Sequence, residues 1–510
     1  MAQTLPTTLT SDDLQQMEDC GIQPEAVHAQ LQRFETGFPT LVLDRPCLVG
    51  DGIRQLSAPQ EQAVVARFEQ EAGQRDIGLF VPASGAATRM FRDLLQFLGG
   101  DTRNESVHHL LTNLSHFAFY ESLKLLMARS CIPVQDRDRR PEDTVTLIEH
   151  LITVKGLNYG NLPKAFIAFH RYPEGPRTAL EEHLAEAAMY ARDASDTVNI
   201  HFTISPAHHA MLRQQFEELS SSFARALGVQ FNLTSSEQLN STDTVAVLPD
   251  NTVYRTRAGK LLFRPAGHGA LLENLNALEH DVVFIKNIDN ILHGSQHAAT
   301  AHYKKVLGGY LLDLQEKVFG FLRSLEAGAK GDQLQAALDF VQDELYWQLP
   351  EEIIYQRSAL AGFLLRALNR PIRVCGMVRN EGQPGGGPFW VRHADNTVSP
   401  QIVEKAQINL AAADQSRIFQ QSTHFNPVDL VCGVRDYKGK RFDLTRFRDP
   451  EMGFITEKSH EGTAIRGQEL PGLWNGSMAR WITVFVEVPL HTFGPVKTVN
   501  DLLGALHQPA

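Results

Sequence analysis

The stretch from residue 77 to residue 98 constrains the fold more than any other part of the sequence. It begins with an apolar run at 77–81, turns through small residues (Ala83, Ser84, Gly85, Ala86, Ala87 and Thr88), and continues with apolar residues at helical spacing. Small residues between a strand and a helix let an anion approach backbone N–H groups, and the helix N-terminus adds partial positive charge there. The stretch therefore predicts an anion-binding turn, which ends in Arg89.

Strand and helix patterns alternate after this turn. Residues 198–204 and 229–233 have strand patterns on either side of a helical segment at 206–227, and residues 282–285 form a short apolar run. Such alternation predicts an α/β fold with a mixed, mostly parallel sheet that helices cover on both faces. Ligands bind such sheets beyond the carboxyl ends of the strands, where both the small-residue turn and Asp289 fall.

Composition narrows the range of partners. The net charge of -11 argues against a general nucleic-acid binder, which would carry basic stripes. The five cysteines are scattered and form no CxxC pair, so neither a disulfide framework nor a zinc site is indicated. Neither a signal peptide nor a membrane-spanning run is apparent. We therefore expect a cytoplasmic protein with no nucleic-acid and no membrane partner.

Two common nucleotide-binding signatures are missing from the sequence. It contains neither the GxGxxG of dinucleotide-binding folds nor the GxxxxGK[ST] of P-loop proteins. This disfavours a dehydrogenase and a P-loop kinase. Any nucleotide would have to be bound by a different arrangement of small residues and cations.

Two further motifs follow the turn in order. Leu162-Pro163-Lys164 precedes an apolar run, and residues 178–184 open a helix that contains Glu182 and His183. Together with residues 84–90, these motifs resemble those of sugar-nucleotide pyrophosphorylases, which carry GGxGTRL, then PK with an apolar tail, then a short helix with Glu-His. The resemblance implies a Rossmann-like nucleotidyltransferase fold of the GT-A type.

Four more segments resemble the branch of that family that makes UDP-N-acetylhexosamines and other UDP-sugars. Residues 264–270 resemble its P-x-G-x-G base-binding loop, and residues 286–290 resemble its N-V-D-N metal motif. Residues 402–408 and 493–497 resemble its V-V-E-Y-S-E-I strand and its F-S-P-L-K motif. The full set is also similar to the bacterial family described as domain of unknown function 4301, over nearly the whole chain.

The resemblance implies a reaction. An oxygen of a sugar 1-phosphate attacks the α-phosphorus of UTP and pyrophosphate leaves, so the protein must supply alignment and positive charge but no general base. The implied catalytic residues are Arg89, Lys164 and Lys497, and Asp289 would hold Mg²⁺. The implied nucleotide-binding residues are Ala83, Ser84, Gly85, Ala86, Ala87, Thr88, Gly267, His268 and Gly269, and the implied sugar-binding residues are Glu404 and Asn426.

The resemblance also implies an organisation along the chain. We expect a mostly helical accessory region at 1–75, the nucleotide-binding part of the core at 76–309, a helical insertion at 310–370, and a sugar-binding and C-terminal part of the core at 371–510. The sequence leaves the sugar, the base and the oligomeric state open.

The chain departs from the family pattern at its phosphate turn and in its sugar motif. Ser84 and Ala87 stand where the family has glycines, and E-Y-S-E becomes Glu404-Lys405-Ala406-Gln407. Two alternatives therefore stay open. One is a glycosyltransferase that uses a nucleotide-sugar, and the other is a non-catalytic protein that binds a sugar-nucleotide.

Overall fold

The computed structural model describes residues 9–85, 87–101, 103–129, 134, 141–383 and 385–509. The chain divides into two compact units, each built from three separate stretches. The first unit comprises Met1–Ala58, Gln238–Asp281 and Tyr310–Glu487, and the second comprises Pro59–Glu237, Val282–Gly309 and Val488–Ala510. The four consecutive regions expected from the sequence describe order along the chain and do not coincide with these units.

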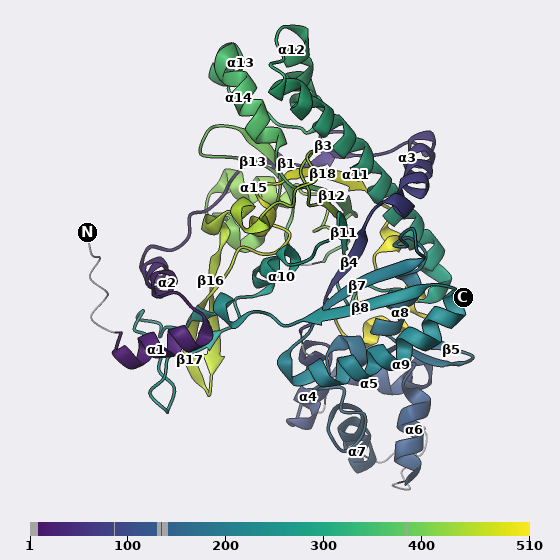
Figure 1. The fold of residues 1–510 in the computed structure, drawn as a ribbon. Coiled ribbons are helices and arrows are strands. Elements are labelled where there is room, and N and C mark those ends of the chain that lie inside the picture. The colour runs from purple at the N-terminus through teal and green to yellow at the C-terminus, as the bar shows by residue number, and fades with distance from the viewer. Residues whose placement is uncertain are drawn as a thin grey trace. The chain divides into compact units, whose positions relative to one another are not determined.

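The second unit contains a parallel sheet in the order β11-β4-β7-β8, three of whose strands lie side by side in Figure 1. These strands are β11 (Val282–Ile285), β4 (Ile77–Pro82), β7 (Thr197–Thr203) and β8 (Gln230–Ser236). Every residue of β11 and nearly every residue of β4 is buried, as expected for parallel strands covered on both faces. Because β4 and β11 are parallel neighbours, the turns that follow them meet at one edge.

Helices make up most of the rest of the second unit, together with the short hairpin of β5 (Ala168–Tyr172) and β6 (Gly175–Thr178). The α-helices that lie wholly or mainly in it are α3 (Ala58–Glu71), α4 (Arg92–Leu98), α5 (Glu105–Thr112), α6 (Tyr120–Arg129), α7 (Pro141–Ile152), α8 (Ala179–Ala187) and α9 (His209–Leu227). Helix α11 (His297–Glu326) begins here, and short 3₁₀ segments at Val499–Leu503 and Ala505–His507 close the chain.

The first unit contains a five-stranded sheet in the order β2-β3-β18-β12-β15, in which only the β12–β15 pair is antiparallel. An antiparallel sheet of β1, β13 and β14 and two hairpins complete its strands. The strands are β1 (Val42–Pro46), β2 (Leu48–Val49), β3 (Gly52–Arg54), β9 (Thr244–Val245), β10 (Phe263–Arg264), β12 (Ile372–Met377), β13 (Gly387–Arg392), β14 (Val398–Val403), β15 (Asp429–Gly433), β16 (Phe454–His460), β17 (Thr463–Glu469) and β18 (Ile482–Glu487).

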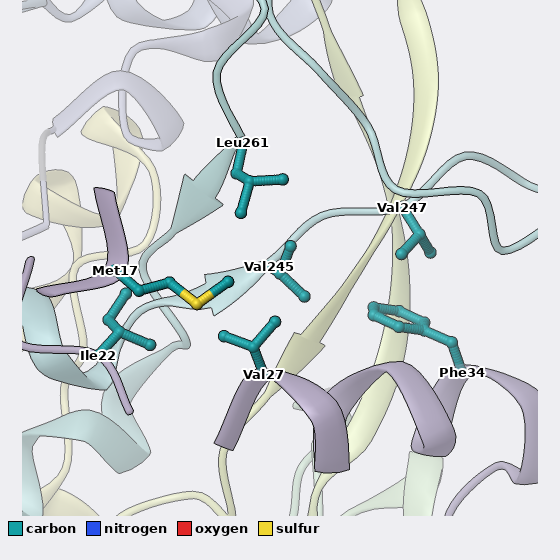
Figure 2. Packing of buried hydrophobic residues seen from close by; sticks show 7 residues of the cluster. All are labelled: Met17, Ile22, Val27, Phe34, Val245, Val247 and Leu261. Carbon is teal, nitrogen blue, oxygen red and sulfur yellow. The ribbon is translucent and has the colours of Figure 1, made fainter. Parts of the chain in front are cut away.

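The helices of the first unit include the two at the N-terminus of the chain. They are α1 (Ser11–Cys20), α2 (Pro24–Thr36), α10 (Leu272–Asn276), α12 (Asp332–Asp339), α13 (Glu351–Tyr355), α14 (Arg357–Leu368) and α15 (Ala413–Gln420). Figure 2 shows how α1 and α2 are held: Met17, Val27 and Phe34 pack against Val245 and Val247 in a cluster where each of these residues is at most 3% exposed. The N-terminal helices thus share a core with residues more than two hundred positions away.

The predicted fold class is confirmed, since the structure is α/β with a mixed, mostly parallel sheet. The predicted helix after the small-residue turn differs in its start. A 3₁₀ turn at Ala87–Arg89 comes first, and α4 begins only at Arg92 without a side-chain cap. Met90, Phe91 and Leu94 are buried, so the apolar spacing marks a packed face and does not fix where the helix begins.

Candidate functional site

The small-residue turn leaves part of its backbone open. The Ala83 N–H donates to Thr203 O at 3.0 Å and the Ala87 N–H donates to Leu162 O at 3.0 Å, so these two groups serve the fold. Within the described residues, the N–H groups of Ser84 and Gly85 have no hydrogen-bond partner, and Gly85 is exposed. These two groups are the ones that an anion could reach. Ala86 lies outside the described residues.

The departures from glycine fit the local backbone. Neither Ser84 nor Ala87 has a positive φ, and Ala87 adopts a 3₁₀ conformation in which its Cβ is buried. A side chain at these positions therefore costs no backbone strain. The replaced glycines do not by themselves disable the turn.

Two lysines from distant segments converge on Asp289, which follows β11. The Asp289 Oδ2 atom accepts hydrogen bonds from Lys164 Nζ at 2.8 Å and from Lys497 Nζ at 3.0 Å. Lys164 Nζ also donates to Val496 O at 2.7 Å. The side chains of Asp289 and Lys164 are each 12% exposed, whereas that of Lys497 is 60% exposed. The structure thus brings together three of the residues that the sequence singled out.

Asp289, Lys164 and Lys497 form a charged trio, and the charges in this trio shift the pKa values of Asp289 and Lys164. Burial by itself would raise the pKa of the Asp289 carboxyl, but the Lys164 and Lys497 ammonium groups outweigh it and hold the pKa below its ordinary value. Burial lowers the pKa of the Lys164 ammonium, and Asp289 offsets part of that effect. With two cations on one carboxylate, the trio has a surplus positive charge that faces partly toward solvent through Lys497.

Backbone hydrogen bonds fix the segments that carry the trio. The Val496 N–H donates to Asp289 O at 2.9 Å, and Asn290 forms a β-bridge with Pro495. The N–H groups of Lys497 and Thr498 both donate to Asp501 Oδ2 at 2.7 Å. These contacts hold Lys497 beside the loop that follows β11.

Arg89 lies on a neighbouring segment. The Val499 N–H donates to Met90 O at 3.1 Å, and the Ala87–Leu162 hydrogen bond joins the turn to the Lys164 segment. The Arg89 side chain is exposed and has neither a hydrogen-bond nor an ion-pair partner among the described residues. Its guanidinium is available to an external anion.

Asp289 is the residue that the resemblance assigns to Mg²⁺. Its Oδ2 atom is engaged by both lysines, while no described residue donates to its Oδ1 atom. In the described part of the chain, no three histidine, cysteine, aspartate or glutamate side chains are arranged to hold a metal ion. Since Mg²⁺ is often bound by one or two carboxylates together with substrate phosphates and water, Asp289 fits this ion as a single protein ligand beside phosphates.

Helix α8 carries three charged or polar side chains that point inward, which the sequence patterns missed. Glu186 accepts two hydrogen bonds of 2.7 Å from Lys286 Nζ, and both side chains are at most 1% exposed. Glu186 also accepts from Thr300 Oγ1 at 2.7 Å. Burial opposes ionisation of Glu186, yet Lys286 and Lys304 hold its pKa far below the ordinary value. The pair ties α8 to the residue that begins the Asp289 loop.

His183, also on α8, holds the loop that contains Asp289 in place. Its Nε2–H group donates to Ile288 O at 3.2 Å, next to Asp289. Burial, followed by the nearby Lys286, lowers the pKa of His183 to about 3, so the ring stays neutral. Glu182 and His183 belong to a motif noted in the sequence, but only the structure shows that His183 positions the Asp289 loop.

A relay of buried hydrogen bonds joins α8 to the C-terminal segment. His170 Nδ1 donates to Glu182 Oε1 at 2.9 Å, and Tyr172 donates to the same oxygen at 2.6 Å. Since burial lowers the pKa of His170 well below its ordinary value, the ring is neutral and its Nε2 accepts from His507 Nδ1 at 2.9 Å. The relay anchors the last residues of the segment that carries Lys497.

The remaining predicted residues lie in the first unit. His268 Nδ1 accepts from the Leu473 N–H at 3.0 Å, its ring stacks on Trp474, and its Nε2 is 3.7 Å from Glu404 Oε1. Asn475 Nδ2 donates to the same Glu404 oxygen at 2.7 Å. The structure thus brings His268 and Glu404 together, and adds the neighbours Trp474 and Asn475.

Two glycines shape the His268 loop. A Cβ atom on Gly269 would lie 2.1 Å from Pro471 O, and Gly267 has a φ of +79°. Both positions therefore require glycine. Asn426 lies beside Gly385 and Gly386, and Gly386 also lies against Val403 O, next to Glu404; the described residues show no hydrogen bond of Asn426 with His268 or Glu404.

The fold and these two groups of residues define an α/β protein with a cationic trio at the carboxyl edge of a parallel sheet. A family model described as "Domain of unknown function (DUF4301)" matches residues 10–508, and the chain belongs to that family. A search of curated proteins finds no match. Of the helices in the described residues, none is long and apolar enough to cross a membrane.

Solved structures of sugar-phosphate nucleotidyltransferases are similar to this chain. The uridine diphosphate N-acetylglucosamine pyrophosphorylase from Trypanosoma brucei is 12% identical with a TM-score of 0.49, and the match covers 97% of this chain and 79% of that one. A UDP-glucose pyrophosphorylase mutant from Leishmania major is 12% identical with a TM-score of 0.44, and the match covers 97% and 79%. The inositol-1-phosphate CTP transferase from T. maritima is 9% identical with a TM-score of 0.28, and the match covers 81% and 85%. Likeness at this level carries no conclusion on activity.

Proposed function

We propose that this chain is a Mg²⁺-dependent nucleotidyltransferase that joins a nucleoside triphosphate, UTP by preference, to a sugar 1-phosphate and releases pyrophosphate. The observation that supports this most is the meeting of Lys164 and Lys497 on Asp289, next to the small-residue turn that carries Arg89. The preference for UTP and the cytoplasmic location are predictions from the sequence resemblance.

The reaction requires no covalent bond between the protein and a substrate. A phosphate oxygen of the sugar 1-phosphate forms a bond to the α-phosphorus, the bond from that phosphorus to the β-phosphate oxygen breaks, and pyrophosphate leaves with the electron pair. Negative charge builds up on the leaving group, and two anionic substrates repel each other. Cations placed beforehand lower the barrier to such a step because they need no reorganisation during it.

Each residue of the trio has a part in this scheme. Lys164 is held by Asp289 and Val496 O and is positioned to hydrogen-bond a phosphate oxygen. Lys497 is exposed enough to move from Asp289 onto a phosphate, and Arg89 needs no partner exchange at all. Mg²⁺, held by Asp289 together with the phosphates, would supply further neutralisation of the leaving group.

In the first unit, we assign base contacts to the loop of Gly267, His268 and Gly269 and sugar contacts to Glu404 and Asn426. The absence of a Cβ at Gly269 and the stacking of His268 on Trp474 give that loop one shape. A loop held in one shape suits recognition of a flat base edge by hydrogen bonds. These roles rest on the resemblance and on the geometry of that unit alone.

The test is an assay of pyrophosphate release from UTP, Mg²⁺ and a panel of sugar 1-phosphates. We expect release with at least one sugar, and a fall of roughly two orders of magnitude for Lys164→Ala, because it removes a charge on the transferring phosphates. Arg92→Ala is the matched control, since Arg92 is an exposed cation on α4. A protein that binds UTP but releases no pyrophosphate with any sugar would overturn the proposal and favour a non-catalytic sugar-nucleotide binder.

A further inference from the structure

The first unit contains a cavity of about 660 Å³ that none of the residues discussed above lines. Its size falls within the range of about 300–1,000 Å³ that is typical of small-molecule sites. Its walls come from the N-terminal strand segment, the end of α14 with the residue that follows it, the β13–β14 hairpin, and the turns before β16 and β18. The lining residues used below are Trp347, Phe363, Arg370, His393, Ser399 and Gln401.

Gln401 lines this cavity and has an unused hydrogen-bond acceptor. Its Nε2 donates to Ala479 O at 3.1 Å and to Ser399 Oγ at 3.2 Å. Because a carbonyl oxygen can only accept, these bonds fix which way the amide is turned. The Oε1 atom is then buried without a hydrogen-bond partner in the described residues, on a side chain that is only 3% exposed. A buried polar atom without a partner is costly, and a donor on a ligand would satisfy it.

Arg370 places a cation on the wall of the same cavity. Its guanidinium lies 4.9 Å from the centre of the Trp347 ring, its Nε donates to Arg366 O at 3.0 Å, and its Nη1 donates to Arg480 O at 3.4 Å. Among the described residues, no carboxylate is within ion-pair distance of it. Burial, with the charge of Arg480 as a second cause, lowers the pKa of Arg370 to about 10, and the Asp395 carboxylate offsets part of this effect.

The other charges around the cavity are largely matched. Arg392 pairs with Asp44 at 2.5 Å, and Glu451 pairs with Arg33. Asp395 accepts from Thr397 Oγ1 at 2.7 Å, and Asp449 lies 3.8 Å from Arg480. Arg370 is therefore a lining arginine with no carboxylate within ion-pair distance among the described residues.

The floor is polar and ordered. In the register of β13 and β14, Val391 faces Ser399 and Phe389 faces Gln401. His393 shares a hydrogen bond of 2.7 Å with Ser399 Oγ, and burial lowers its pKa, so its ring is neutral. A neutral floor leaves Arg370, which makes no ion pair among the described residues, as the group with which an anionic ligand can pair.

We propose that this cavity binds a small aromatic acid whose anionic group pairs with Arg370 and whose hydroxyl or N–H group donates to Gln401 Oε1. The planar apolar part packs among Trp347, Phe363 and Met452, which line the same space. The anion supplies the counter-charge that the fold lacks, and the donor satisfies the orphaned amide oxygen. The site is independent of the proposed nucleotidyltransferase activity and uses none of its residues.

Calorimetric titration of the full chain with three probes tests the proposal. The probes are 4-hydroxybenzoate, 4-hydroxyphenyl phosphate and the uncharged 4-hydroxybenzyl alcohol. We expect one or both anions to bind at least roughly ten-fold more tightly than the alcohol, since hydrogen bonds to charged groups are the stronger kind. The carboxylate and the phosphate distinguish which anion the wall prefers.

Variants locate the binding. Arg370→Gln should weaken the anions roughly ten-fold or more and leave the alcohol unchanged. Gln401→Met should weaken 4-hydroxybenzoate and have no effect on benzoate, which lacks the donor. Arg366→Gln, which alters an exposed arginine near the end of α14, is the matched control and should change nothing.

Three outcomes would overturn the proposal. Absence of binding of both anions to the unaltered protein at millimolar concentration would do so. So would equal binding of the uncharged alcohol, or anion binding that survives Arg370→Gln. Circular dichroism checks that each variant is folded, and Gln401→Met gives a second measure of the site if Arg370→Gln does not fold.

Discussion

The Arg89 side chain makes no hydrogen bond or ion pair with any described residue. It is exposed and unpaired, so its removal breaks no contact that holds the fold. We expect Arg89→Ala to lower pyrophosphate release roughly hundred-fold. We also expect the free energy of unfolding in urea to stay within about 0.5 kcal/mol of the original, as is usual for surface substitutions. A large loss of stability would show that Arg89 has a structural role instead.

Glu186 is the opposite case, because it is wholly buried and holds a buried lysine. Glu186→Gln removes the charge that compensates Lys286, which is 1% exposed. Breaking one partner of a buried pair typically costs about 3–5 kcal/mol. We expect a loss of that size in urea unfolding, whereas Glu217→Gln, on the exposed face of α9, should be neutral. A loss below about 1 kcal/mol would contradict the pairing.

The sequence and the structure differ in what they reveal about these single residues. Lys164 and Asp289 could be singled out because their neighbours in sequence form recognisable motifs. Glu186 could not, since a glutamate in a helix is usually solvated and nothing local marks it as buried. No sequence pattern singled out Arg370 or Gln401. The proposal rests on an ion pair that Arg370 lacks and a hydrogen bond that Gln401 Oε1 lacks among the described residues, and a local pattern cannot show either.

At the scale of elements, the strands were more predictable than the turn between β4 and α4. The strand at Val282–Ile285 coincides with its apolar run, since burial on both faces needs a continuous apolar segment. The 3₁₀ turn at Ala87–Arg89 was not foreseen, because the same residues suit either helix type. Among the described residues, the N–H groups of Ser84 and Gly85 are therefore open to an anion, and they lie several residues before the first turn of α4.

The C-terminal segment should make stability depend on pH through His507. Burial, with His170 as a further cause, lowers the pKa of His507 to about 3 in the folded chain, while in the unfolded chain it is near 6.5. At pH values between these two pKa values, His507 is protonated in the unfolded chain and neutral in the folded chain. Stability due to this group is therefore full above about pH 6.5 and is lost as the pH falls toward 3.

The variant His507→Asn isolates this contribution, since its amide can replace Nδ1–H as the donor to His170 but does not titrate. We expect the free energy of unfolding to fall less steeply between pH 6 and pH 4 in the variant, by up to about 1.4 kcal/mol per pH unit. Urea unfolding at several pH values measures this. Identical slopes for the two proteins would show that His507 is protonated in the folded state.

At the scale of the whole molecule, a bound nucleotide should stabilise the fold. A ligand that binds only the folded state at about one hundred times its dissociation constant adds about 2.7 kcal/mol. We expect UTP with Mg²⁺ to raise the thermal unfolding midpoint, and the rise to shrink for Lys164→Ala. Parallel scans with CTP, GTP and ATP rank the bases. No rise with any of the four would contradict nucleotide binding by the cationic trio.

The sequence by itself determined the α/β class, the four strands β4, β7, β8 and β11, and the segments that carry Arg89, Lys164, Asp289 and Lys497. These depend on local patterns of apolar residues, small residues and turns. The tertiary structure alone decided that Lys164 and Lys497, separated from Asp289 by 125 and 208 residues, share one carboxylate oxygen. It alone turned the charges of α8 inward and left Arg370 with no ion-pair partner among the described residues. Such pairings arise from packing between distant segments, and no local pattern encodes which distant group will be the neighbour.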